Sequence, residues 1–588
     1  MSGPRSLPAP PVASTAAATA EAVADSEVAV AQPPIRWHIA PEWGPRLAAL
    51  RDVSIQRWLE RHSSRIVKHG PHRTVYRIEL GDEAVFLKHA RCPSRTQRLA
   101  NLFRNSASRR EWHNSRRILE RGVPTAEPVA FGERTQGGLI GDSYLLTRSI
   151  PRSRSFDEFL AHVDATTSGS ERQLARLNAM QRLAELCALA HRAGVEHDDF
   201  HVGNVLVQPS ADDAALPARL YLIDLPGVRL RRTLNWRRSC DSLATLITGL
   251  LFHCDDEQLD ALCRHYVAAR SDLAIVDLDG ATLQILRRSR QLARRVLQRR
   301  DQRAFRTNRH FVHDVCDGTR LHLTADLEPR QVYGVVGDGD APLGKFIDRP
   351  CKLTHASVVV EGQLRVADEP WHVAYKRCRV TRLWKLLLAP LRRSRALDAW
   401  YRANALVARG IATPRPIMAI EPPWPTRWRE SYLATQWIPD VLNLHLYAWK
   451  LAELPRDRRV AAANVCAQRM GTLIGRMHHW GVSHRDLKAC NLLVASVGND
   501  VECHVVDPDG VRIRRHVSFR RRSRDLARLA ASMAAHPWLP KTTLLRFMRE
   551  YLRAQRDVQL DWKQLWRSIA RLSSRAVAHK QRRGEIVA

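Results

Sequence analysis

The chain has 588 residues, which is too many for one hydrophobic core and predicts two or more domains. Its 45% hydrophobic and 26% charged residues are ordinary for a soluble protein that folds. The 93 Lys and Arg residues outnumber the 60 Asp and Glu residues, and the net charge of +33 favours anionic partners, namely nucleic acid, an anionic membrane surface or a phosphorylated substrate. An arginine-rich, GC-biased genome explains the same excess, so charge alone does not choose a partner.

The cysteines and the lengths of the apolar runs indicate in which cellular compartment the protein is expected. The eleven cysteines include no CxxC pair, which argues against a disulfide scaffold and against a zinc site. Residues 1–36 are rich in Ala and Pro and are interrupted by acidic residues, so we interpret them as a disordered tail rather than a signal peptide. No run approaches the about 18 apolar residues that span a bilayer. We expect a cytoplasmic protein that is soluble or lies peripherally on the inner face of the cytoplasmic membrane.

Short alternating runs after the tail predict a small antiparallel sheet. The first clear strands are "TVYRIEL" (Thr74–Leu80) and "AVFLKH" (Ala84–His89). A helix is expected around Trp112, followed by a strand ending in "SYLLT" (Ser143–Thr147). Apolar residues at three- and four-residue spacing in "LAELCALAHRAG" (Leu183–Gly194) then predict a long helix. Strands with one helix, followed mostly by helices, predict an α+β domain with two lobes.

The whole pattern occurs twice. "SYLLTRSIP" (Ser143–Pro151) matches "SYLATQWIP" (Ser431–Pro439) 288 residues later, and the same offset relates Lys88 to Lys376. Downstream, "QRLAELCALAHRAGVEHDD" matches "QRMGTLIGRMHHWGVSHRD" at an offset of 287. We interpret this as a tandem duplication of one domain. The predicted parts are the tail 1–36, domain 1 at 37–280, a basic connector at 281–340, domain 2 at 341–560 and a basic tail at 561–588.

Copy one contains an ordered set of residues suited to phosphoryl transfer. Transfer from ATP needs a cation on the phosphates, oxygen ligands for Mg²⁺ and a carboxylate near the acceptor hydroxyl. The candidates are Lys88 for the phosphates, Glu111 to orient that lysine, Asp199 in "HDDFHVGN" as base, and Asn204 and Asp224 as metal ligands. Each residue alone is weak evidence, because an Asp after a strand usually caps a turn. The ordered set, found twice, predicts an ATP-dependent kinase.

Copy two repeats the set with one difference. Its candidates are Lys376, Asp486, Asn491 and Asp507. The separation between lysine and base is 111 residues in copy one and 110 in copy two. A gap-free alignment, however, places Ala399 opposite Glu111, so copy two is expected to lack the carboxylate that orients the lysine. We expect copy one to be catalytically competent and copy two to be either active or a nucleotide-binding regulator.

The motifs "REW…RGVPTAEP", "SYLLT", "HDDFHVGN" and "IDLPG", with their second-copy counterparts, resemble those of the lipopolysaccharide kinase family. This family contains the heptose and Kdo kinases of Gram-negative core assembly and belongs to the protein-kinase-like superfamily. The resemblance covers residues 40–265 and 345–555 and implies two tandem bilobal domains, each with ATP between its lobes. It implies that adenine touches the backbone at Arg148, Ser149 and Ile150 in copy one and at Gln436, Trp437 and Ile438 in copy two.

Two departures from eukaryotic-type protein kinases favour a glycan such as the lipopolysaccharide core, or another small molecule, as acceptor. Neither copy has a GxGxxG loop, and only a dozen residues separate Asp224 from the helix predicted at Trp236, too few for a phosphorylation-controlled segment. Copy one also has Asp198 in place of the HRD arginine. The alternatives are a bacterial Ser/Thr/Tyr protein kinase, which Lys488 in "HRDLKACN" favours, and a pseudokinase scaffold with one or both copies inactive. Nucleic-acid binding has only the charge in its favour.

One segment of copy two suggests a contact with an anionic membrane surface. "VTRLWKLLLAPLRRSR" (Val380–Arg395) combines apolar residues with a basic rim, as do helices that lie among lipid headgroups. A helix that packs on its own lobe is the alternative.

Four histidines near the two bases are interpreted as structural. His191 and His478 each precede a base by eight residues on a predicted helix, so we expect them to be buried and hydrogen-bonded. His197 and His484 are expected to brace the loops that carry the bases.

Overall fold

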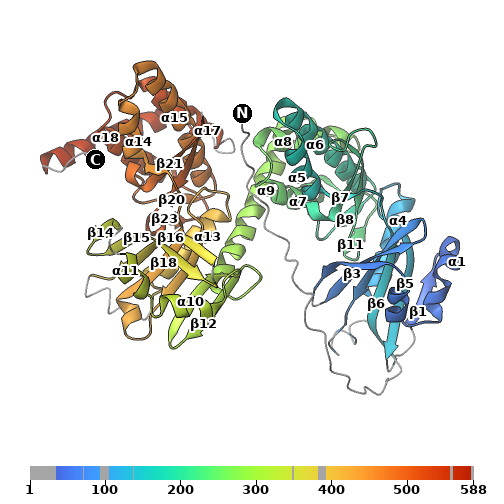
Figure 1. Cartoon of the computed structure of the whole chain (residues 1–588). Helices are drawn as coiled ribbons and strands as arrows, with labels where there is room; N and C mark the ends of the chain where they lie inside the picture. The colour runs from blue at the N-terminus through green and yellow to red at the C-terminus, as the bar shows by residue number, and fades with distance from the viewer. Residues whose placement is uncertain are drawn as a thin grey trace. The chain divides into compact units, whose positions relative to one another are not determined.

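The chain forms two compact units in the computed structural model (Figure 1). Unit 1 comprises Met1–Glu120, Thr125–Ile150 and Asp224–Pro226, and unit 2 comprises the rest. The structure describes residues 35–583 except 71, 93, 95–97, 99–104, 137, 347–349, 368, 382–391, 499 and 556–559. Most of the predicted N-terminal tail and the apolar part of the predicted membrane-contacting segment lie outside the described residues.

Unit 1 is built on a six-stranded antiparallel sheet. Its order is β1 (Ile35–Ile39), β5 (Pro128–Gln136), β6 (Leu139–Arg148), β4 (Glu83–Ala90), β3 (Arg73–Leu80) and β2 (Ser64–His69). Alternate residues Ile78, Val85 and Leu87 are buried in a core that Trp112 of α4 (Ala107–Glu120) joins. The short helices α1 (Gly44–Leu47) and α2 (Ile55–Glu60) precede this sheet. The two strands and the helix predicted here are confirmed.

Unit 2 begins with the helical part of copy one. Its helices are α5 (Phe156–Thr166), α6 (Gly169–Arg192), α7 (Trp236–Leu250), α8 (Asp256–Ala269) and α9 (Leu278–Asp301). Its short strands are β7 (Arg154–Ser155), β8 (Val195–His197), β9 (Val205–Pro209), β10 (Pro217–Leu222) and β11 (Val228–Leu230). The helix predicted at Leu183–Gly194 is the second half of α6, which buries Leu183, Leu186 and Cys187.

The sheet of copy two has seven strands and begins earlier than expected. Its order is β12 (Phe311–Cys316), β13 (Thr319–Thr324), β17 (Pro416–Glu421), β18 (Glu430–Gln436), β16 (Glu369–Arg379), β15 (Ser357–Val366) and β14 (Pro350–Thr354). The helices α10 (Pro329–Val336), α11 (Ala341–Phe346) and α13 (Arg395–Val407) accompany it. The predicted connector at 281–340 therefore supplies two strands of this sheet, joined by a tight turn at Asp317 and Gly318, both with positive φ.

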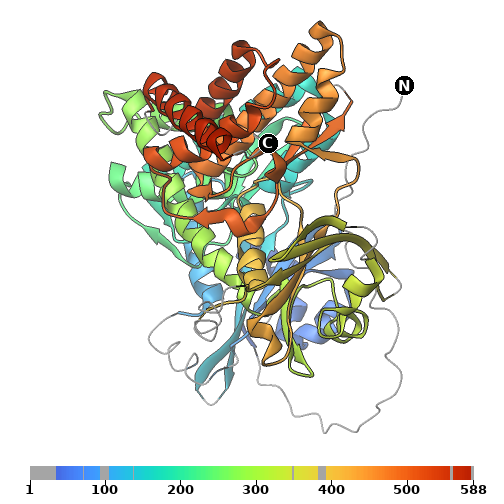
Figure 2. The ribbon, with the colours of Figure 1, turned by 90° about the vertical axis from the view of Figure 1, so that its left-hand side faces the viewer.

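The helical part of copy two repeats that of copy one and lies on one side of its sheet (Figures 1 and 2). Its elements are β19 (Val441–Asn443), α14 (Leu444–Ala452), α15 (Arg456–His479), β20 (Val482–His484), β21 (Leu492–Val497), β22 (Asp500–Val505), β23 (Val511–Ile513), α16 (Phe519–Met533), α17 (Lys541–Arg553) and α18 (Trp562–Arg582). The predicted basic tail at 561–588 thus forms a helix, and its Leu565 is fully buried in the core of copy two.

Matching strand pairs confirm the duplication and the α+β fold class. The three-stranded sheet β7-β9-β10 of copy one has its counterpart in β19-β21-β22 of copy two. The two-stranded sheet β8-β11 corresponds to β20-β23, with His197 opposite Val228 and His484 opposite Val511. Both copies therefore place the loop of the predicted base between the same two small sheets.

Within unit 2, a buried ion pair joins the helix α9 of copy one to copy two. Arg409, which follows α13, donates two hydrogen bonds of 2.8 and 2.7 Å to the carboxylate of Asp301 at the end of α9. Both side chains are at most 2% exposed. Trp400 donates to the carbonyl of Ala304 at 2.9 Å nearby. A bidentate pair fully removed from water fixes α13 against α9.

We expect Asp301→Asn to lower the free energy of unfolding by about 3–5 kcal/mol, because Arg409 is left as an uncompensated buried charge. Urea unfolding of the full chain measures the change. The double variant Asp301→Leu with Arg409→Met is the control, since it removes both charges and is expected to recover most of the stability. Unfolding transitions that coincide for Asp301→Asn and the wild type would contradict this role for the pair.

Candidate active site

Both copies hold the predicted base in a loop braced by a histidine. In copy two the backbone N–H of Asp486 donates to Nδ1 of His484 at 3.3 Å, so Nε2 carries the proton and donates to the carbonyl of Asp507 at 3.1 Å. In copy one His197 accepts from the N–H of Asp199 at 3.2 Å. Burial lowers the pKa of His484, which favours the neutral ring that both bonds require. The bracing role predicted for these histidines is confirmed.

An asparagine closes each base loop. Nδ2 of Asn204 donates to the carbonyl of Asp199 at 2.9 Å, and Nδ2 of Asn491 donates to the carbonyl of Asp486 at 2.8 Å. Because the amide nitrogen is used in this way, the amide oxygen of each asparagine is the atom that points to a ligand. The carboxylates of Asp199 and Asp486 are 79% and 53% exposed, so an acceptor can reach them.

The two copies also place a basic side chain beside the base at equivalent positions. Lys488 Nζ lies 3.1 Å from a carboxylate oxygen of Asp486. The equivalent residue of copy one is His201, whose Nε2 lies 3.5 Å from the carboxylate of Asp199. Burial opposes the charged form of Lys488, but Asp486 nevertheless raises its pKa.

The predicted metal-binding aspartates share an unusual backbone conformation. Asp224 and Asp507 follow strands β10 and β22 and have φ of 64° and 57°, in the left-handed region. Asp tolerates this region better than most residues, and such strain is often found at functional sites. Within unit 1, the carboxylate of Asp224 accepts from Arg73 at 2.8 Å. Asp199 and Asn204 belong to unit 2.

Copy one contains the predicted pair between lysine and helix. Nζ of Lys88 on β4 donates to the carboxylate of Glu111 on α4. The two side chains are only 14% and 8% exposed. The helix therefore presents its carboxylate to the lysine, as the sequence predicted.

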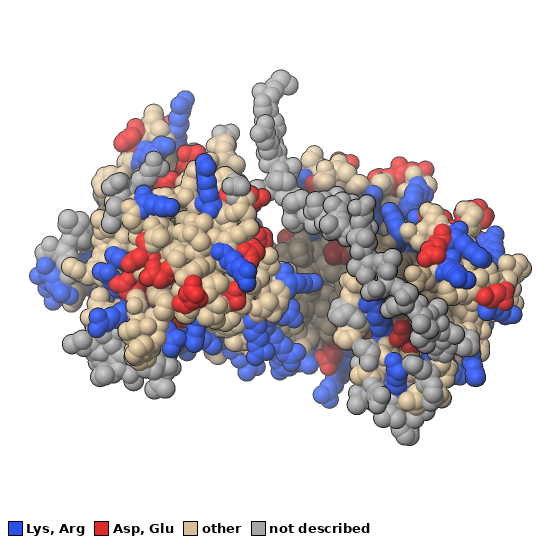
Figure 3. All heavy atoms as spheres, turned by 60° about the horizontal axis from the view of Figure 1, so that its bottom comes forward, with Lys and Arg blue, Asp and Glu red and all other residues tan. Residues whose placement is uncertain are grey.

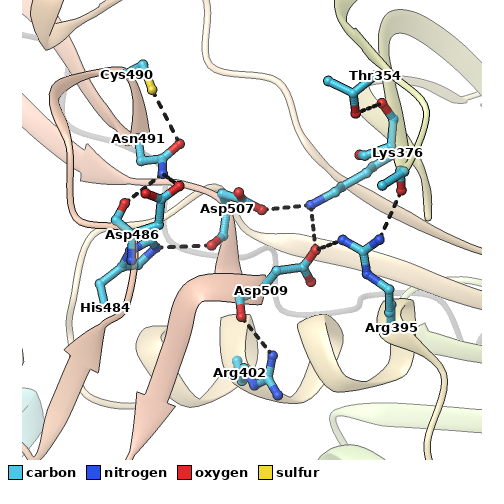
Figure 4. A network of polar contacts seen from close by, with 12 residues as sticks. Thr354, Lys376, Arg395, Arg402, His484, Asp486, Cys490, Asn491, Asp507 and Asp509 are labelled. Atoms are coloured by element: carbon cyan, nitrogen blue, oxygen red, sulfur yellow. Dashed lines mark hydrogen bonds and ion pairs between the residues drawn. The ribbon is translucent and has the colours of Figure 1, made fainter. Parts of the chain in front are cut away.

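In copy two the lysine has different partners (Figure 4). Nζ of Lys376 on β16 lies 2.8 Å from the carboxylate of Asp507 and 3.1 Å from that of Asp509. Burial alone would lower the pKa of Lys376, but Asp509 and Asp507 raise it above its ordinary value. Arg395 at the start of α13 donates to the same oxygen of Asp509 at 2.8 Å. The lysine of copy two is thus held by a carboxylate, contrary to the expectation from Ala399.

Sequence reasoning missed Asp509, although the alignment of the copies contains a signal for it. "DLPG" of copy one aligns with "DPDG" of copy two, so Asp509 stands where copy one has Pro226. Ala399 is fully buried in an apolar cluster with Trp400 and Leu433. The carboxylate missing from the helix therefore reappears two residues after Asp507, the aspartate predicted to bind a metal. A reciprocal exchange of this kind becomes visible only when both positions are compared together.

The strand ends predicted to contact adenine offer one free donor in copy two. The backbone N–H of Gln436 donates to the backbone carbonyl of Arg415 at 2.8 Å, and that of Trp437 donates to the backbone carbonyl of His372 at 2.9 Å. Within the described residues, the N–H of Ile438 has no hydrogen-bond partner. In copy one the backbone N–H groups of Arg148 and Ser149 donate to the backbone carbonyls of Glu127 and Ala84, at 2.8 Å each.

The oxygen atoms of copy two fit a magnesium ion. Mg²⁺ prefers carboxylate and amide oxygens and usually keeps waters or phosphates in its remaining positions. Asn491 offers its amide oxygen, and Asp507 offers a carboxylate whose present partner is a lysine ammonium. A cation already lies against Asp507, so the site attracts positive charge.

The buried histidines are structural, as predicted. His191 is 1% exposed, and its ring nitrogens lie 2.7 Å from the hydroxyl of Tyr266 and 3.0 Å from that of Ser242. His478 lies 2.8 Å from the hydroxyl of Tyr551 at the equivalent place. Burial lowers the pKa of His191 to about 3, so this ring is neutral at physiological pH and carries no proton to the site.

These elements define a protein-kinase-like fold, present here as two tandem copies. Each copy has an antiparallel sheet that carries the lysine, with one helix beside it. Its helical part carries the HxD loop and the Asn and Asp that follow. The family model described as "Lipopolysaccharide kinase (Kdo/WaaP) family" matches residues 90–266 and 354–567. The chain belongs to this family.

Curated relatives match one copy at a time. The chain is 26% identical over 171 residues to "Lipopolysaccharide core heptose(I) kinase WaaP" of Escherichia coli, a match that covers 28% of this chain and 63% of that protein. It is 28% identical over 144 residues to the protein of the same name from Pseudomonas aeruginosa, covering 24% of this chain and 53% of that protein. The matched region thus spans less than two thirds of either relative.

Solved structures with a likeness to this chain include one titled "WaaP in complex with acyl carrier protein", at 22% identity and a TM-score of 0.32. The match covers 44% of this chain and 99% of that chain. Another is a spectinomycin phosphotransferase, APH(9)-Ia, in complex with ADP and spectinomycin, at 11% identity and a TM-score of 0.24, covering 44% of this chain and 90% of that chain.

We expect Asp509→Asn to destabilise copy two by about 1–3 kcal/mol, because Lys376 and Arg395 lose charge-assisted hydrogen bonds in a largely buried place. Urea unfolding followed by fluorescence measures the change. The matched control is Asp398→Asn on α13, whose carboxylate is more exposed than that of Asp509 and whose pair with Arg402 contributes less than about 1 kcal/mol. Equal effects of the two substitutions would show that Asp509 has no special role.

Proposed function

We propose that the protein is a Mg·ATP-dependent kinase that transfers the γ-phosphate to a sugar hydroxyl of the lipopolysaccharide core or a similar glycan. The observation that carries this proposal is the network of copy two, in which Lys376, Asp507, His484, Asp486 and Asn491 are joined by hydrogen bonds (Figure 4). The same residue types stand in the same order in copy one. Family membership and the names of the relatives support the sugar acceptor.

Each residue has a role that its surroundings support. Lys88 and Lys376 bind the phosphates of ATP as buried cations whose position a carboxylate fixes. Asp199 and Asp486 orient the acceptor hydroxyl and accept its proton, since their exposed carboxylates stand on braced loops. The N–H of Ile438 binds the adenine edge in copy two.

Each copy has two residues that would hold Mg²⁺, namely Asn204 and Asp224 in copy one and Asn491 and Asp507 in copy two. When bound, the ion neutralises charge on the phosphate oxygens and so favours the transfer. In copy two Lys376 contacts one carboxylate oxygen of Asp507 and also the carboxylate of Asp509, so Asp509 would keep the lysine in place if Asp507 served the ion.

We assign the transfer to copy one. Its lysine is held by Glu111, which belongs to the helix, so Asp224 does not have to anchor the lysine. In copy two the metal-binding Asp507 is itself a partner of Lys376. In both copies a cation already lies beside the metal-binding candidate, Arg73 against Asp224 and Lys376 against Asp507. Only in copy two is that cation the lysine proposed to hold the phosphates, which suits a regulator or a second, slower site.

The acceptor and the surface charge favour the cytoplasmic face of the inner membrane as the site of action. Lys and Arg side chains are numerous on the face that Figure 3 presents, and the chain carries a net charge of +33. Among the described residues, no helix is long and apolar enough to cross a membrane. Peripheral attraction to anionic lipids brings a basic protein to a lipid-linked glycan.

Transfer of label from γ-labelled ATP to deacylated lipopolysaccharide, with total protein as a parallel pool, tests the proposal. We expect label in the glycan and a loss of at least about 100-fold in Asp199→Asn, because a positioned general base contributes about 10²–10⁴-fold. Asp486→Asn is the matched variant in copy two and is expected to lose less. Asp212→Asn, on an exposed turn of copy one, is the control for the change of charge.

Other outcomes identify the alternatives. Label only in the protein pool would make the chain a protein kinase, in agreement with Lys488 beside Asp486. Equal losses in both base variants would show that both copies are needed. No label in either pool would favour a pseudokinase scaffold.

A further inference from the structure

Copy two contains a polar cavity on the side of α13 where β16 ends and β18 begins. It has a volume of about 610 Å³. Ten arginines line it: Arg320, Arg379, Arg392, Arg393, Arg395, Arg402, Arg427, Arg429, Arg485 and Arg512. Only four carboxylates, those of Asp398, Glu421, Glu430 and Asp509, share the lining, so the cavity has a formal excess of six positive charges. We call these ten arginines and their cavity the arginine pocket.

Most of the positive charge in the arginine pocket is not neutralised by protein. Arg379 pairs with Glu430, Arg395 with Asp509 and Arg402 with Asp398. Within the described residues, the other seven arginines have no carboxylate within 4.0 Å, the ion-pair distance. Three of the four carboxylates are already used by these pairs, so little negative charge is left to repel an anion.

Three arginines of the pocket act on one another electrostatically: Arg402 of α13, Arg485 of the HRD loop and Arg512 of β23. Burial, together with the neighbouring charges of Arg402 and Arg485, lowers the pKa of Arg512 to about 10. Burial is the main cause of this lower pKa, the charges of Arg402 and Arg485 add to it, and the carboxylates of Asp398 and Asp509 oppose it without cancelling it. The arrangement is costly in the absence of an anion and becomes favourable when an anion lies among the three groups.

Copy one lacks these features at the equivalent positions. Arg485 corresponds to Asp198, and the carboxylate of Asp198 lies 3.6 Å from Arg229, the equivalent of Arg512. Arg395 and Arg402 correspond to Ala107 and Asn114. The charge cluster is therefore a property of copy two and not of the fold.

The arginine pocket is connected to the lysine of the candidate active site. Arg395 lines the pocket and donates to the carboxylate of Asp509, which also holds Lys376. Arg402 donates to the backbone carbonyl of Asp509 at 3.2 Å (Figure 4). A ligand that touches these two arginines thus acts on the residue that positions the lysine.

We propose that the arginine pocket binds a ligand that carries two or more phosphate groups and that this ligand stabilises Asp509 in its contact with Lys376. Guanidinium groups match phosphate oxygens in pairs, and several of them surround one cavity. Its volume lies in the range of small-molecule sites, about 300–1,000 Å³, and exceeds what a single phosphate fills. The effect on Lys376 rests on its proposed role in nucleotide binding, whereas the binding of the ligand does not.

Calorimetric titration of the full chain with pyrophosphate tests the site. We expect Arg485→Asp to weaken binding at least tenfold, because the substitution removes one cation and gives Arg512 the kind of partner that Arg229 has in copy one. The matched control is Arg524→Asp on α16, an exposed position outside the pocket with the same change of charge, which is expected to change binding less than twofold. If both variants weaken pyrophosphate binding equally, the loss reflects the net charge of the protein and not the arginine pocket, and the proposal is overturned.

Thermal unfolding without pyrophosphate separates binding from folding. Since Arg485→Asp relieves repulsion in the pocket, its melting temperature is expected to equal or exceed that of the wild type, while its shift on adding pyrophosphate is smaller. A shift as large as in the wild type would overturn the proposal.

Two further experiments, one titration and one vesicle flotation, identify the site and the source of the phosphate. The double variant Lys88→Ala with Lys376→Ala is expected to keep pyrophosphate binding, and loss there would place the bound pyrophosphate at the nucleotide sites instead. Flotation with phosphatidylcholine vesicles, with and without diacylglycerol pyrophosphate, distinguishes a free phosphorylated ligand from a lipid headgroup. Binding to diacylglycerol pyrophosphate that Arg485→Asp removes supports the lipid source; binding of pyrophosphate alone supports the free ligand.

Discussion

The structure of both copies depends on the need to neutralise one buried lysine. An ammonium group that lies at the end of a central strand and is largely shielded from water requires a carboxylate beside it. Copy one supplies this carboxylate from the helix, with Glu111 against Lys88. Copy two supplies it from the loop after β22, with Asp509 against Lys376. The same electrostatic requirement is thus met by a helix in copy one and by a loop in copy two. In copy two the carboxylate that holds the lysine also contacts Arg395.

The parts of the site that could be predicted from sequence are those that depend on short spacings. His484, Asp486 and Asn491 lie within eight residues, and their mutual hydrogen bonds follow from one loop conformation. The pair of Lys88 and Glu111 could be predicted because the order of strand and helix brings them together. The contact of Asp509 with Arg395 could not, since 114 residues separate them and only the packing of helix on loop joins them. The hairpin of β12 and β13 was missed although the sequence contains a signal for it, since Asp317-Gly318 joins two short runs rich in apolar residues. Its pairing with β17, which makes it part of the sheet, could not be predicted from that local signal.

Helix α13 of copy two is held at both ends by charged groups from distant segments. At its start Arg395 contacts Asp509, and just beyond its end Arg409 is paired with Asp301 of α9. The second pair is almost fully buried and fixes the helix to α9, the last helix of copy one. The first pair is more exposed and can respond to solutes. Arg395 thus connects the arginine pocket to Asp509, the residue that holds the lysine.

Three differences between the copies have a common electrostatic consequence. Relative to copy one, copy two has Ala399 in place of Glu111, Asp509 in place of Pro226, and Arg485 in place of Asp198. The first two move a negative charge from the helix to the loop, and the third removes the partner that would neutralise Arg512. As a result, the carboxylate that holds Lys376 stands between the lysine on one side and a group of uncompensated arginines on the other. An anion among those arginines weakens their attraction for Asp509 and leaves this carboxylate to the lysine, so the state of the nucleotide site depends on a ligand bound outside it.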